Sequence, residues 1–341
     1  MRNNAITRRQ FIAATGALGT TMGLAACGGG QSNENADAGA TDLTKLTFCL
    51  DYTPNTNHTG IYVAQKLGYF AEEGIEVEIV QPAEDGAEAM VGTGQAEVGV
   101  SYQDYLAGAY QGGNTGLFAV AAIIQHNTSG IMSKGGLGIT HPAAMEDKRY
   151  ATWELDVEQA TVKQVVEDDG GDFSKIIMVP YTVDDEIAGF KADLFDSVWA
   201  FEGWAGQNAA VQGYDVDYFS FVSINEVFDY YTPVIVANIE YAEAHPDIMK
   251  AFLRGAKKGY EYCIEHVDEA ADILLEAAPE IDAQLAHASQ AYLADQYVAD
   301  APSWGVFDGE RWSAFYEWLS KNTEMGAGID VNAGWTNDYL A

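Results

Sequence analysis

Polar side chains are concentrated at the start of the segment DYTPNTNHTGIYVAQKLGYF, between a predicted strand and a predicted helix. The group comprises an acid, a tyrosine, two amides and an imidazole: Asp51, Tyr52, Asn55, Asn57 and His58. An ordinary turn or a helix cap would explain any one of them, but capping requires only one short polar side chain. In an open α/β sheet, ligands bind beyond the carboxyl ends of the strands. We therefore predict that this segment forms part of a ligand-binding site.

Other predicted strand ends carry side chains of the same kinds. Ser101, Tyr102 and Gln103 follow the strand AEVGV, and Gln125 follows LFAVAAII. In the second half of the chain the candidates are Trp153, after RYAT, and Trp199, Glu202 and Trp204 in DSVWAFEGWAG. Aromatic rings stack on flat ligands, whereas hydroxyl, amide and carboxylate groups form directional hydrogen bonds. The set predicts a cleft for a flat ligand with polar edges, although some of the 7 Trp and 19 Tyr will belong to the core.

Neither a metal site nor a bound cofactor is predicted. The histidines are scattered, and no metal-ligand spacing occurs in the chain. Binders of sulfonate, nitrate or phosphate need convergent N–H donors and commonly an Arg or Lys. No basic residue stands in the motifs above, which favours a neutral or amine-bearing heterocycle over an anion.

The composition bounds the class of protein. The 341 residues are 48% hydrophobic and 20% charged, as expected of a globular chain long enough for two domains. The 51 acids outnumber the 17 bases, so the formal net charge is −34. Nucleic acids and anionic membrane surfaces require a basic footprint, so this charge argues against both as the main partner.

The first 27 residues resemble a lipoprotein signal peptide. Arg8 and Arg9 precede Phe11 and Ile12 as in a twin-arginine export signal, and LAAC ends at the lipidation candidate Cys27. The apolar run before Cys27 is glycine-rich and shorter than the roughly 20 residues of a spanning helix. Residues 28–43 are predicted to be a flexible tether. We expect export to the outer face of the cytoplasmic membrane and anchoring there by lipid.

Strand-like and helix-like segments alternate from residue 45 onward, which predicts an α/β fold with doubly wound sheets. Strands are predicted in KLTFCLD, VEIVQP, AEVGVSY, LFAVAAIIQ, RYATW, SKIIMVPY, FDSVWAFE, DYFSFV and the segment starting at YYTPVIVAN. Helices are predicted near 59–68, 83–94, 105–110, 156–168, 184–191 and 205–212, followed by a long amphipathic helix and a helical tail. Cys49 falls in a predicted strand and Cys263 in a predicted helix. Two buried thiols are favoured, and a disulfide between them remains the alternative.

Two such units predict two lobes that close on a ligand by a hinge motion. Lobe 1 is assigned to residues 44–130 plus 233–341 and lobe 2 to residues 131–232. The hinge is predicted near residues 129–133 and 229–234, where Gly130 and the Tyr231–Thr232–Pro233 stretch suit a change of direction.

The segment DYTPNTNHTGIYVAQKLGYFAEEGIEVEIV resembles the thiamine pyrimidine-precursor branch of ABC-transporter substrate-binding proteins. This branch shares its fold with the "no message in thiamine" pyrimidine proteins and with the alkanesulfonate-binding proteins. A looser similarity continues through VGTGQAEVGVSYQD, KRYATW and FEGWAG, and therefore spans most of residues 45–260. The resemblance implies a type II periplasmic-binding-protein fold with two lobes joined by a two-strand hinge. It also implies a pyrimidine ring held between aromatic side chains, with carboxylates or amides on its amino group and ring nitrogens.

The sequence thus favours a binding protein without catalytic activity, which delivers a hydroxymethylpyrimidine or formylaminopyrimidine type of ligand to ABC permease and ATPase subunits. One alternative keeps the transport role but changes the ligand to riboflavin or another flat nitrogen heterocycle. A second alternative is a pyrimidine synthase. The resemblance implies that such an enzyme depends on iron and consumes its own histidine. Its cysteine-rich motif is absent from this sequence.

Overall fold

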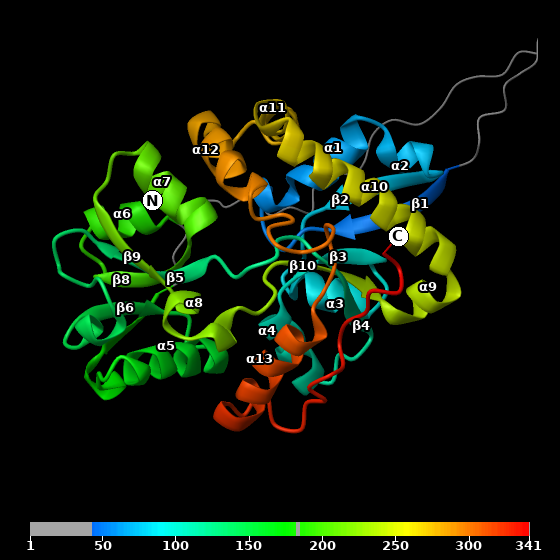
Figure 1. The fold of residues 1–341 in the computed structure, drawn as a ribbon. Helices are drawn as coiled ribbons and strands as arrows, with labels where there is room; N and C mark the ends of the chain where they lie inside the picture. Colours follow the sequence, from blue (N-terminus) through cyan, green and yellow to red (C-terminus); the bar gives the residue numbers. More distant parts are fainter. Residues whose placement is uncertain (1–42, 182–184, 341) are drawn as a thin grey trace, which may run out of the picture. The chain divides into compact units, whose positions relative to one another are not determined.

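The computed structural model describes residues 43–181 and 185–340, which contain two five-stranded sheets (Figure 1). Sheet 1 has the strand order β2 (Ile75–Val80), β1 (Thr44–Cys49), β3 (Val98–Ser101), β10 (Val234–Asn238) and β4 (Leu117–Ala122). Sheet 2 has the order β7 (Ile177–Pro180), β6 (Arg149–Thr152), β8 (Ser197–Phe201), β5 (Ser129–Lys134) and β9 (Val216–Ser220). In each sheet one strand is antiparallel to its neighbours: β10 in sheet 1 and β5 in sheet 2. The two sheets therefore have equivalent topologies.

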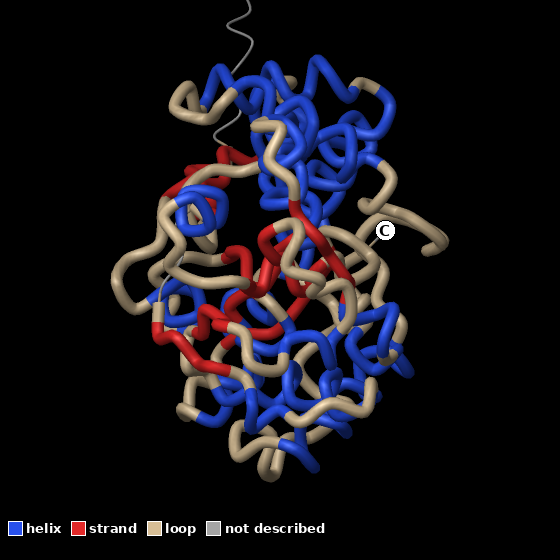
Figure 2. The backbone as a smooth tube through the Cα atoms, turned by 90° about the vertical axis from the view of Figure 1, so that its left-hand side faces the viewer, coloured by secondary structure: helices blue, strands red, loops and turns tan. Residues whose placement is uncertain are grey.

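In Figure 2 helices lie above and below the strands, and the buried side chains of sheet 1 pack in two separate clusters. The burial of β1 shows why this strand is apolar on both faces. Leu46 and Phe48 pack in one cluster with Ile61 and Phe252, whereas Cys49 packs in another cluster with Val91. The side chains of β1 alternate between these two cores, as the two-residue period of a strand requires.

The described residues contain thirteen α-helices, of which the last five follow the final strand. The first six are α1 (Thr59–Lys66), α2 (Tyr69–Glu72), α3 (Gly86–Gly92), α4 (Gln103–Gln111), α5 (Asp156–Asp168) and α6 (Glu186–Lys191). The others are α7 (Gln207–Val211), α8 (Phe221–Ile224), α9 (Ile239–Ala244), α10 (Pro246–Glu265), α11 (Val267–Ala277), α12 (Ala283–Ala294) and α13 (Gly309–Asn322). A 3₁₀ turn (Thr56–His58) precedes α1, and a π-helical turn (Glu202–Gly206) precedes α7.

Two irregular segments, residues 123–128 and residues 229–233, connect the sheets. Asn127 joins these segments, since its backbone N–H donates to Asp229 Oδ1 at 3.0 Å and its side chain donates to the carbonyl of Phe228 at 2.8 Å. Of the two predicted hinge segments, the first, at residues 129–133, is wrong, because these residues pair in β5 with β8 and β9. The first crossing therefore ends before Ser129. The Gly-rich composition of SGIMSKGGLG concealed this central strand.

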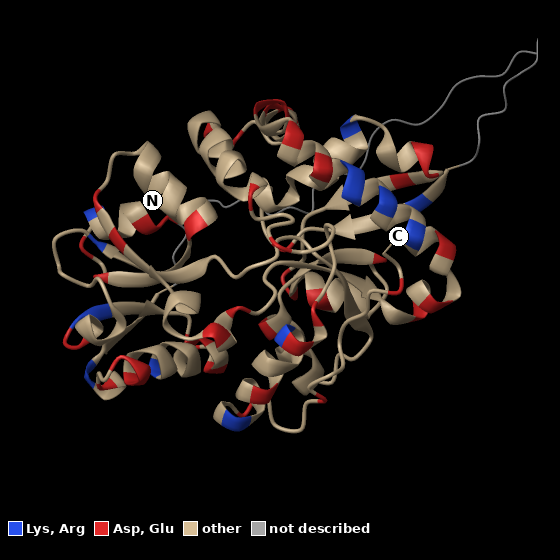
Figure 3. Ribbon diagram, viewed as in Figure 1, with Lys and Arg blue, Asp and Glu red and all other residues tan. Residues whose placement is uncertain are grey.

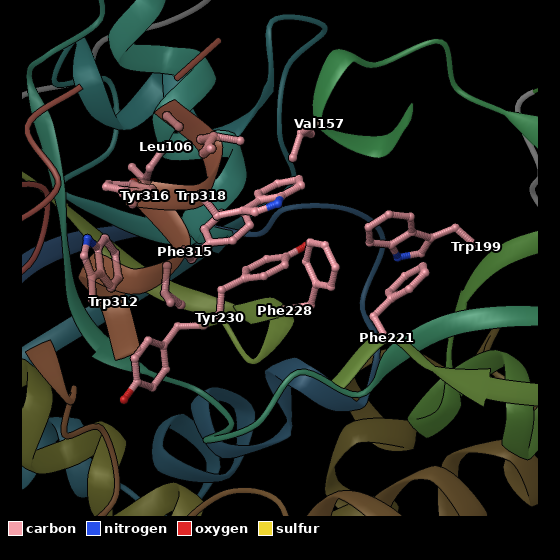
Figure 4. Packing of buried hydrophobic residues seen from close by; sticks show 14 of the residues in the cluster. Leu106, Val157, Trp199, Phe221, Phe228, Tyr230, Trp312, Phe315, Tyr316 and Trp318 are labelled. Carbon is pink, nitrogen blue, oxygen red and sulfur yellow. The ribbon is translucent and has the colours of Figure 1, made fainter. Parts of the chain in front are cut away.

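Helix α13, close to the end of the chain, packs against elements of both sheets. The Phe315 and Tyr230 rings are stacked with centroids 4.0 Å apart, and Trp318 meets Phe228 edge-on at 4.9 Å. Trp318 Nε1 also donates to Gln164 Oε1 of α5 at 3.3 Å. Figure 4 shows this line of aromatic rings between α13 and the rings of Trp199 and Phe221. The helical tail is therefore part of the core and contacts the second crossing segment.

The other predicted elements are confirmed, with ends shifted by a few residues. The expected strand SKIIMVPY begins later, because residues Phe173–Lys175 form a 3₁₀ turn. Cys49 and Cys263 are both buried and unlinked. No helix among residues 43–181 and 185–340 is long and apolar enough to cross a membrane. The signal-peptide residues, including Cys27, and most of the tether lie outside the described residues.

Candidate ligand-binding site

A cavity of about 400 Å³ is lined by residues from both sheets. Its aromatic lining residues are Tyr52, Tyr102, Tyr105, Trp153, Trp199, Phe201, Trp204 and Tyr230. Its acidic lining residues are Asp51, Asp104, Glu158 and Glu186. Among the described residues, no Lys, Arg or His lines this cavity. Figure 3 shows instead that basic residues are gathered along α10, on the outer side of sheet 1.

Asp51, directly after β1, is held by a hydrogen-bonded group at the cavity. His58 Nδ1 accepts the backbone N–H of Asn55 at 3.2 Å, so the proton of a neutral imidazole lies on Nε2. That nitrogen contacts Asp51 Oδ1 at 2.6 Å, and the Tyr102 hydroxyl donates to Asp51 Oδ2. Burial opposes ionisation of Asp51, but the interactions with His58 and Tyr102 outweigh it and hold the pKa of Asp51 below its usual value. Asp51 is therefore an ionised carboxylate with a fixed orientation.

The local sequence explains why this group forms. The Asn55 side chain accepts the backbone N–H of Asn57 at 2.9 Å and caps the 3₁₀ turn, while the carbonyl of Asn57 accepts the hydroxyl of Tyr260 at 2.8 Å. His58 is fully buried beneath the turn. The polar residues of this segment thus divide into two functions: His58 positions Asp51, whereas Asn55 and Asn57 shape the turn and line the cavity.

Asp104 lies in the first turn of α4 and is 7% exposed. Its Oδ2 is 3.4 Å from the hydroxyl of Tyr230, while its Oδ1 has no hydrogen-bond partner among the described residues. Burial raises the pKa of Asp104 to about 6, against the opposing effect of backbone N–H groups and the Tyr230 hydroxyl. Asp104 therefore differs from Asp51 in being an incompletely paired carboxyl group.

Sheet 2 contributes tryptophans to the cavity. Trp199, in β8, lies between Trp153 and Phe221, with ring centroids 5.8 Å and 4.3 Å away. Glu158 fixes the segment that carries Trp153: its carboxylate accepts the Tyr150 hydroxyl at 2.8 Å and the Trp153 backbone N–H at 3.0 Å. Burial raises the pKa of Glu158, although these hydrogen bonds oppose the shift. Trp204 lines the cavity from the π-helical turn after β8.

Eight of the predicted binding residues line the cavity and five do not. The lining residues are Asp51, Tyr52, Asn55, Asn57, Tyr102, Trp153, Trp199 and Trp204. The residues outside the lining are His58, Ser101, Gln103, Gln125 and Glu202.

Each of the five residues outside the lining is bound elsewhere in the protein. Ser101 donates to Glu88 at 2.6 Å. Gln103 bridges Trp312 and Tyr231, and Gln125 donates to the carbonyl of Val306 at 3.2 Å. Glu202 accepts the Tyr292 hydroxyl at 3.1 Å, and His58 contacts Asp51 as described above. A place after a strand is thus not sufficient, since the side chain can turn into the core.

Sequence reasoning missed Asp104, Tyr105, Glu158, Glu186 and Tyr230 as lining residues. Asp104 and Tyr105 directly follow the candidate triplet SYQ, so the first turn of the next helix was a usable signal. Burial raises the pKa of Glu186, at the start of α6, to about 7. Tyr230 lies in the second crossing segment, and no local pattern distinguishes it from a core residue.

Comparisons with known proteins agree with this architecture. Residues 55–270, more than half of the chain, match the family model described as NMT1/THI5 like. The formylaminopyrimidine-binding protein of Halalkalibacterium halodurans is 28% identical over 303 residues, which cover 87% of this chain and 89% of that protein. A 4-amino-5-hydroxymethyl-2-methylpyrimidine phosphate synthase of Saccharomyces cerevisiae is 20% identical over 313 residues, which cover 87% of this chain and 88% of that enzyme.

Solved structures are also similar. The periplasmic aliphatic sulphonate binding protein SsuA of Escherichia coli superposes with a TM-score of 0.68 at 15% identity and covers 87% of this chain and 99% of its own. This likeness and the strand order of both sheets confirm the predicted type II periplasmic-binding-protein fold. At this identity the likeness concerns the fold alone.

Proposed function

Because this chain belongs to the NMT1/THI5-like family, we propose that it is the substrate-binding component of an ABC importer. Its proposed ligand is a pyrimidine precursor of thiamine, of the hydroxymethylpyrimidine or formylaminopyrimidine type. The name of the similar protein from Halalkalibacterium halodurans supports the ligand class, and the fold shared with SsuA supports the binding role.

The observation that carries the proposal is the combination of indole rings and carboxylates around one cavity. Trp153, Trp199 and Trp204 offer flat apolar faces to a heterocycle. Asp51 and Asp104 offer acceptors for the N–H groups of an aminopyrimidine. A cavity of about 400 Å³ falls within the usual size range of small-molecule sites.

The charge of the lining distinguishes this site from one for anions. A sulfonate or nitrate would lie beside several carboxylates with no described Lys, Arg or His in the lining to offset their charge. Such like-charge contacts are unfavourable, and more so in a buried cavity than in water. The proposed ligand is therefore neutral or cationic, in contrast to the sulfonate named for SsuA.

The proposed place of the protein is the outer face of the cytoplasmic membrane, where the lipid on Cys27 anchors it and residues 28–43 act as the tether. The proposed partners are the permease and ATPase subunits of the importer. Mass spectrometry of the membrane-extracted protein tests the anchor. A diacylated Cys27 as the first residue supports it, whereas a chain that begins elsewhere contradicts it.

We further propose that the protein has no catalytic role, although the yeast relative is named a synthase. No His, Cys, Lys or Ser lines the described cavity, so its groups for acid–base or nucleophilic chemistry are carboxylates and the hydroxyls of Thr and Tyr. Bound pyrimidine recovered unchanged after incubation supports this role. Conversion of a substrate to the pyrimidine phosphate would contradict it.

A thermal-shift titration of residues 28–341 tests the ligand class. The panel comprises hydroxymethylpyrimidine, formylaminopyrimidine, thiamine, riboflavin, taurine and nitrate. A ligand that binds only the folded state adds about 2.7 kcal/mol at a concentration 100 times its Kd, so a true ligand raises the Tm progressively. A shift with the pyrimidines alone supports the proposal. A shift with riboflavin alone would retain the transport role and replace the ligand, whereas a shift with taurine or nitrate would contradict the reasoning from charge.

A further inference from the structure

Asp104 has fewer hydrogen bonds than the two other buried carboxylates that line the cavity. Asp51 is bound by His58 and Tyr102, and both oxygens of Glu158 accept hydrogen bonds. Asp104 has one side-chain hydrogen bond, at 3.4 Å from the Tyr230 hydroxyl, besides the influence of backbone N–H groups in its own helical turn, and its Oδ1 has no partner among the described residues. An ionised carboxylate has about four acceptor positions. Asp104 therefore retains the capacity to bind a donor that the described protein does not supply.

Among the described residues, no positively charged group acts on Asp104 to stabilise its ionised form. The titratable groups that act on it are Glu88 of α3, the neighbouring Tyr105, Tyr230 of the crossing segment and Tyr316 of α13. All of them are acids, and Glu88 disfavours the charge on Asp104. Burial raises the pKa of Asp104 to about 6, in keeping with this environment. Unpaired buried carboxyl groups are rare, which points to a partner outside the chain.

Trp199, which lines the cavity from sheet 2, has a hydrogen-bond donor without a partner, whereas Asp104 has an acceptor without one. The residue is 4% exposed, and its Nε1–H has no acceptor among the described residues. Buried Trp N–H groups usually have a partner. Two residues of the cavity lining thus carry a buried polar atom without a partner, the acceptor Oδ1 of Asp104 in α4 and the donor Nε1–H of Trp199 in β8. A molecule that carries both an N–H donor and an acceptor would satisfy the two groups together.

We propose that Asp104 determines the specificity of the cavity by accepting hydrogen bonds from the amino group of an amino-substituted nitrogen heterocycle, while Trp199 Nε1–H donates to an acceptor atom of the same ligand. This inference rests on the proposed function, because it assigns the amino group of the pyrimidine to one residue. An oxo-substituted heterocycle presents a carbonyl oxygen to Asp104 and is rejected. Asp104 lies in the helix after β3 of sheet 1 and Trp199 lies in β8 of sheet 2, so such a ligand is held from the sides of both sheets.

The test is the exchange of Asp104→Asn, which turns one acceptor into an N–H donor while keeping the size of the side chain. Calorimetry measures the Kd of wild type and variant for hydroxymethylpyrimidine and for its oxo counterpart, in which a carbonyl oxygen replaces the amino group. We expect the variant to bind hydroxymethylpyrimidine at least tenfold more weakly and to bind the oxo compound as well as wild type or better. A residue with a merely structural role would change both affinities by the same factor.

Two further variants make the result decisive. Asp295→Asn makes the same chemical change at an exposed position after α12 and should leave both affinities unchanged. If Asp104→Asn does not give a folded protein by circular dichroism, Asp104→Ser replaces it with a smaller hydroxyl and carries the same expected loss of discrimination. Equal affinity of wild type and folded variant for hydroxymethylpyrimidine would overturn this inference alone. Failure of the wild type to bind any pyrimidine would overturn the proposed function and this inference together.

Discussion

Sheet 1 brings carboxylates to the cavity from the segments after its strands, whereas the sheet 2 side brings indole rings together with the paired carboxylate of Glu158 and with Glu186 at the start of α6. Asp51 and Asp104 follow β1 and β3, and Trp199 lies within β8. Glu158, in α5, accepts hydrogen bonds from the Tyr150 hydroxyl and from the backbone N–H of Trp153. The difference suggests a division of roles in which sheet 1 selects the polar edge of the ligand and sheet 2 provides the surface for its ring.

The largest expected effect comes from Trp199, which tests whether the aromatic side of the cavity also belongs to the core. Trp199 is almost fully buried and contacts Trp153 and Phe221, so Trp199→Ala should lower the free energy of unfolding by about 3 kcal/mol or more. Urea denaturation of the unliganded protein measures this loss. Trp204→Ala is the comparison within the same cavity, and since Trp204 is half-buried we expect a smaller loss, of about 1 kcal/mol. Equal losses for the two variants would remove the distinction between core and surface tryptophans.

Asp104 tests the polar side of the cavity through the pH dependence of stability. Its folded pKa of about 6 lies above the unfolded value, so the folded state binds more protons and loses stability as pH rises from about 4 to about 6. Asp104→Asn removes this loss. We therefore expect the variant to be more stable than wild type by about 2 kcal/mol at pH 7.5 and to differ little at pH 4.

Urea denaturation of the unliganded proteins at both pH values provides the measurement. Asp295→Asn again serves as the control, because it makes the same chemical change at an exposed position outside the cavity lining. A variant that is less stable than wild type at pH 7.5 would show that Asp104 is satisfied in the unliganded protein. In that case the ionised Asp104 carboxylate would not destabilise the unliganded protein, contrary to what its proposed role in binding predicts.

Asp51 should show the opposite sign, although it lies on the same side of the cavity. Its folded pKa is lowered, so its contribution to stability is present above the unfolded pKa and is lost as pH falls through the folded pKa. Asp51→Asn should therefore lower the free energy of unfolding at pH 7 by roughly 2 kcal/mol, the usual order for a hydrogen bond to a charged group. The difference from wild type should shrink as the pH falls below about 4. A difference that does not change with pH would mean that His58 and Tyr102 do not favour the ionised form.

The sequence predicted the elements well because most of them have a clear hydrophobic period or buried strand character. It missed β5, since the Gly-rich segment around Gly130 has the composition of a loop. Gly130 lies within this strand at a point where an added Cβ would come 2.2 Å from the carbonyl oxygen of Phe219, so glycine is required there by packing. Local composition cannot distinguish this requirement from the demands of a turn.

The cavity was only partly predictable for a related reason. Position after a strand indicated the correct edge of each sheet, but the direction of a side chain depends on partners distant in sequence. Gln103 faces Trp312 and Tyr231, whereas the next residue, Asp104, lines the cavity. These partners lie more than 120 positions away in the chain, and only the folded packing determines which neighbour faces the ligand.

Tyr52 gives the smallest expected effect on stability and sharpens the comparison at the rim of the cavity. Its ring is 59% exposed although it lines the cavity, so it contributes little to the core. Tyr52→Ala should change the free energy of unfolding by less than about 0.5 kcal/mol. If the ring covers the bound pyrimidine, the variant should bind hydroxymethylpyrimidine more weakly by about 1 kcal/mol, or roughly fivefold, as expected for one aromatic contact. Tyr181→Ala, at a tyrosine with 41% exposure outside the cavity, should leave the affinity unchanged. An unchanged affinity in Tyr52→Ala as well would exclude this rim residue from ring binding and leave that role to the more deeply placed aromatic residues of the lining, because the exposed ring of Tyr52 would then not contact the ligand.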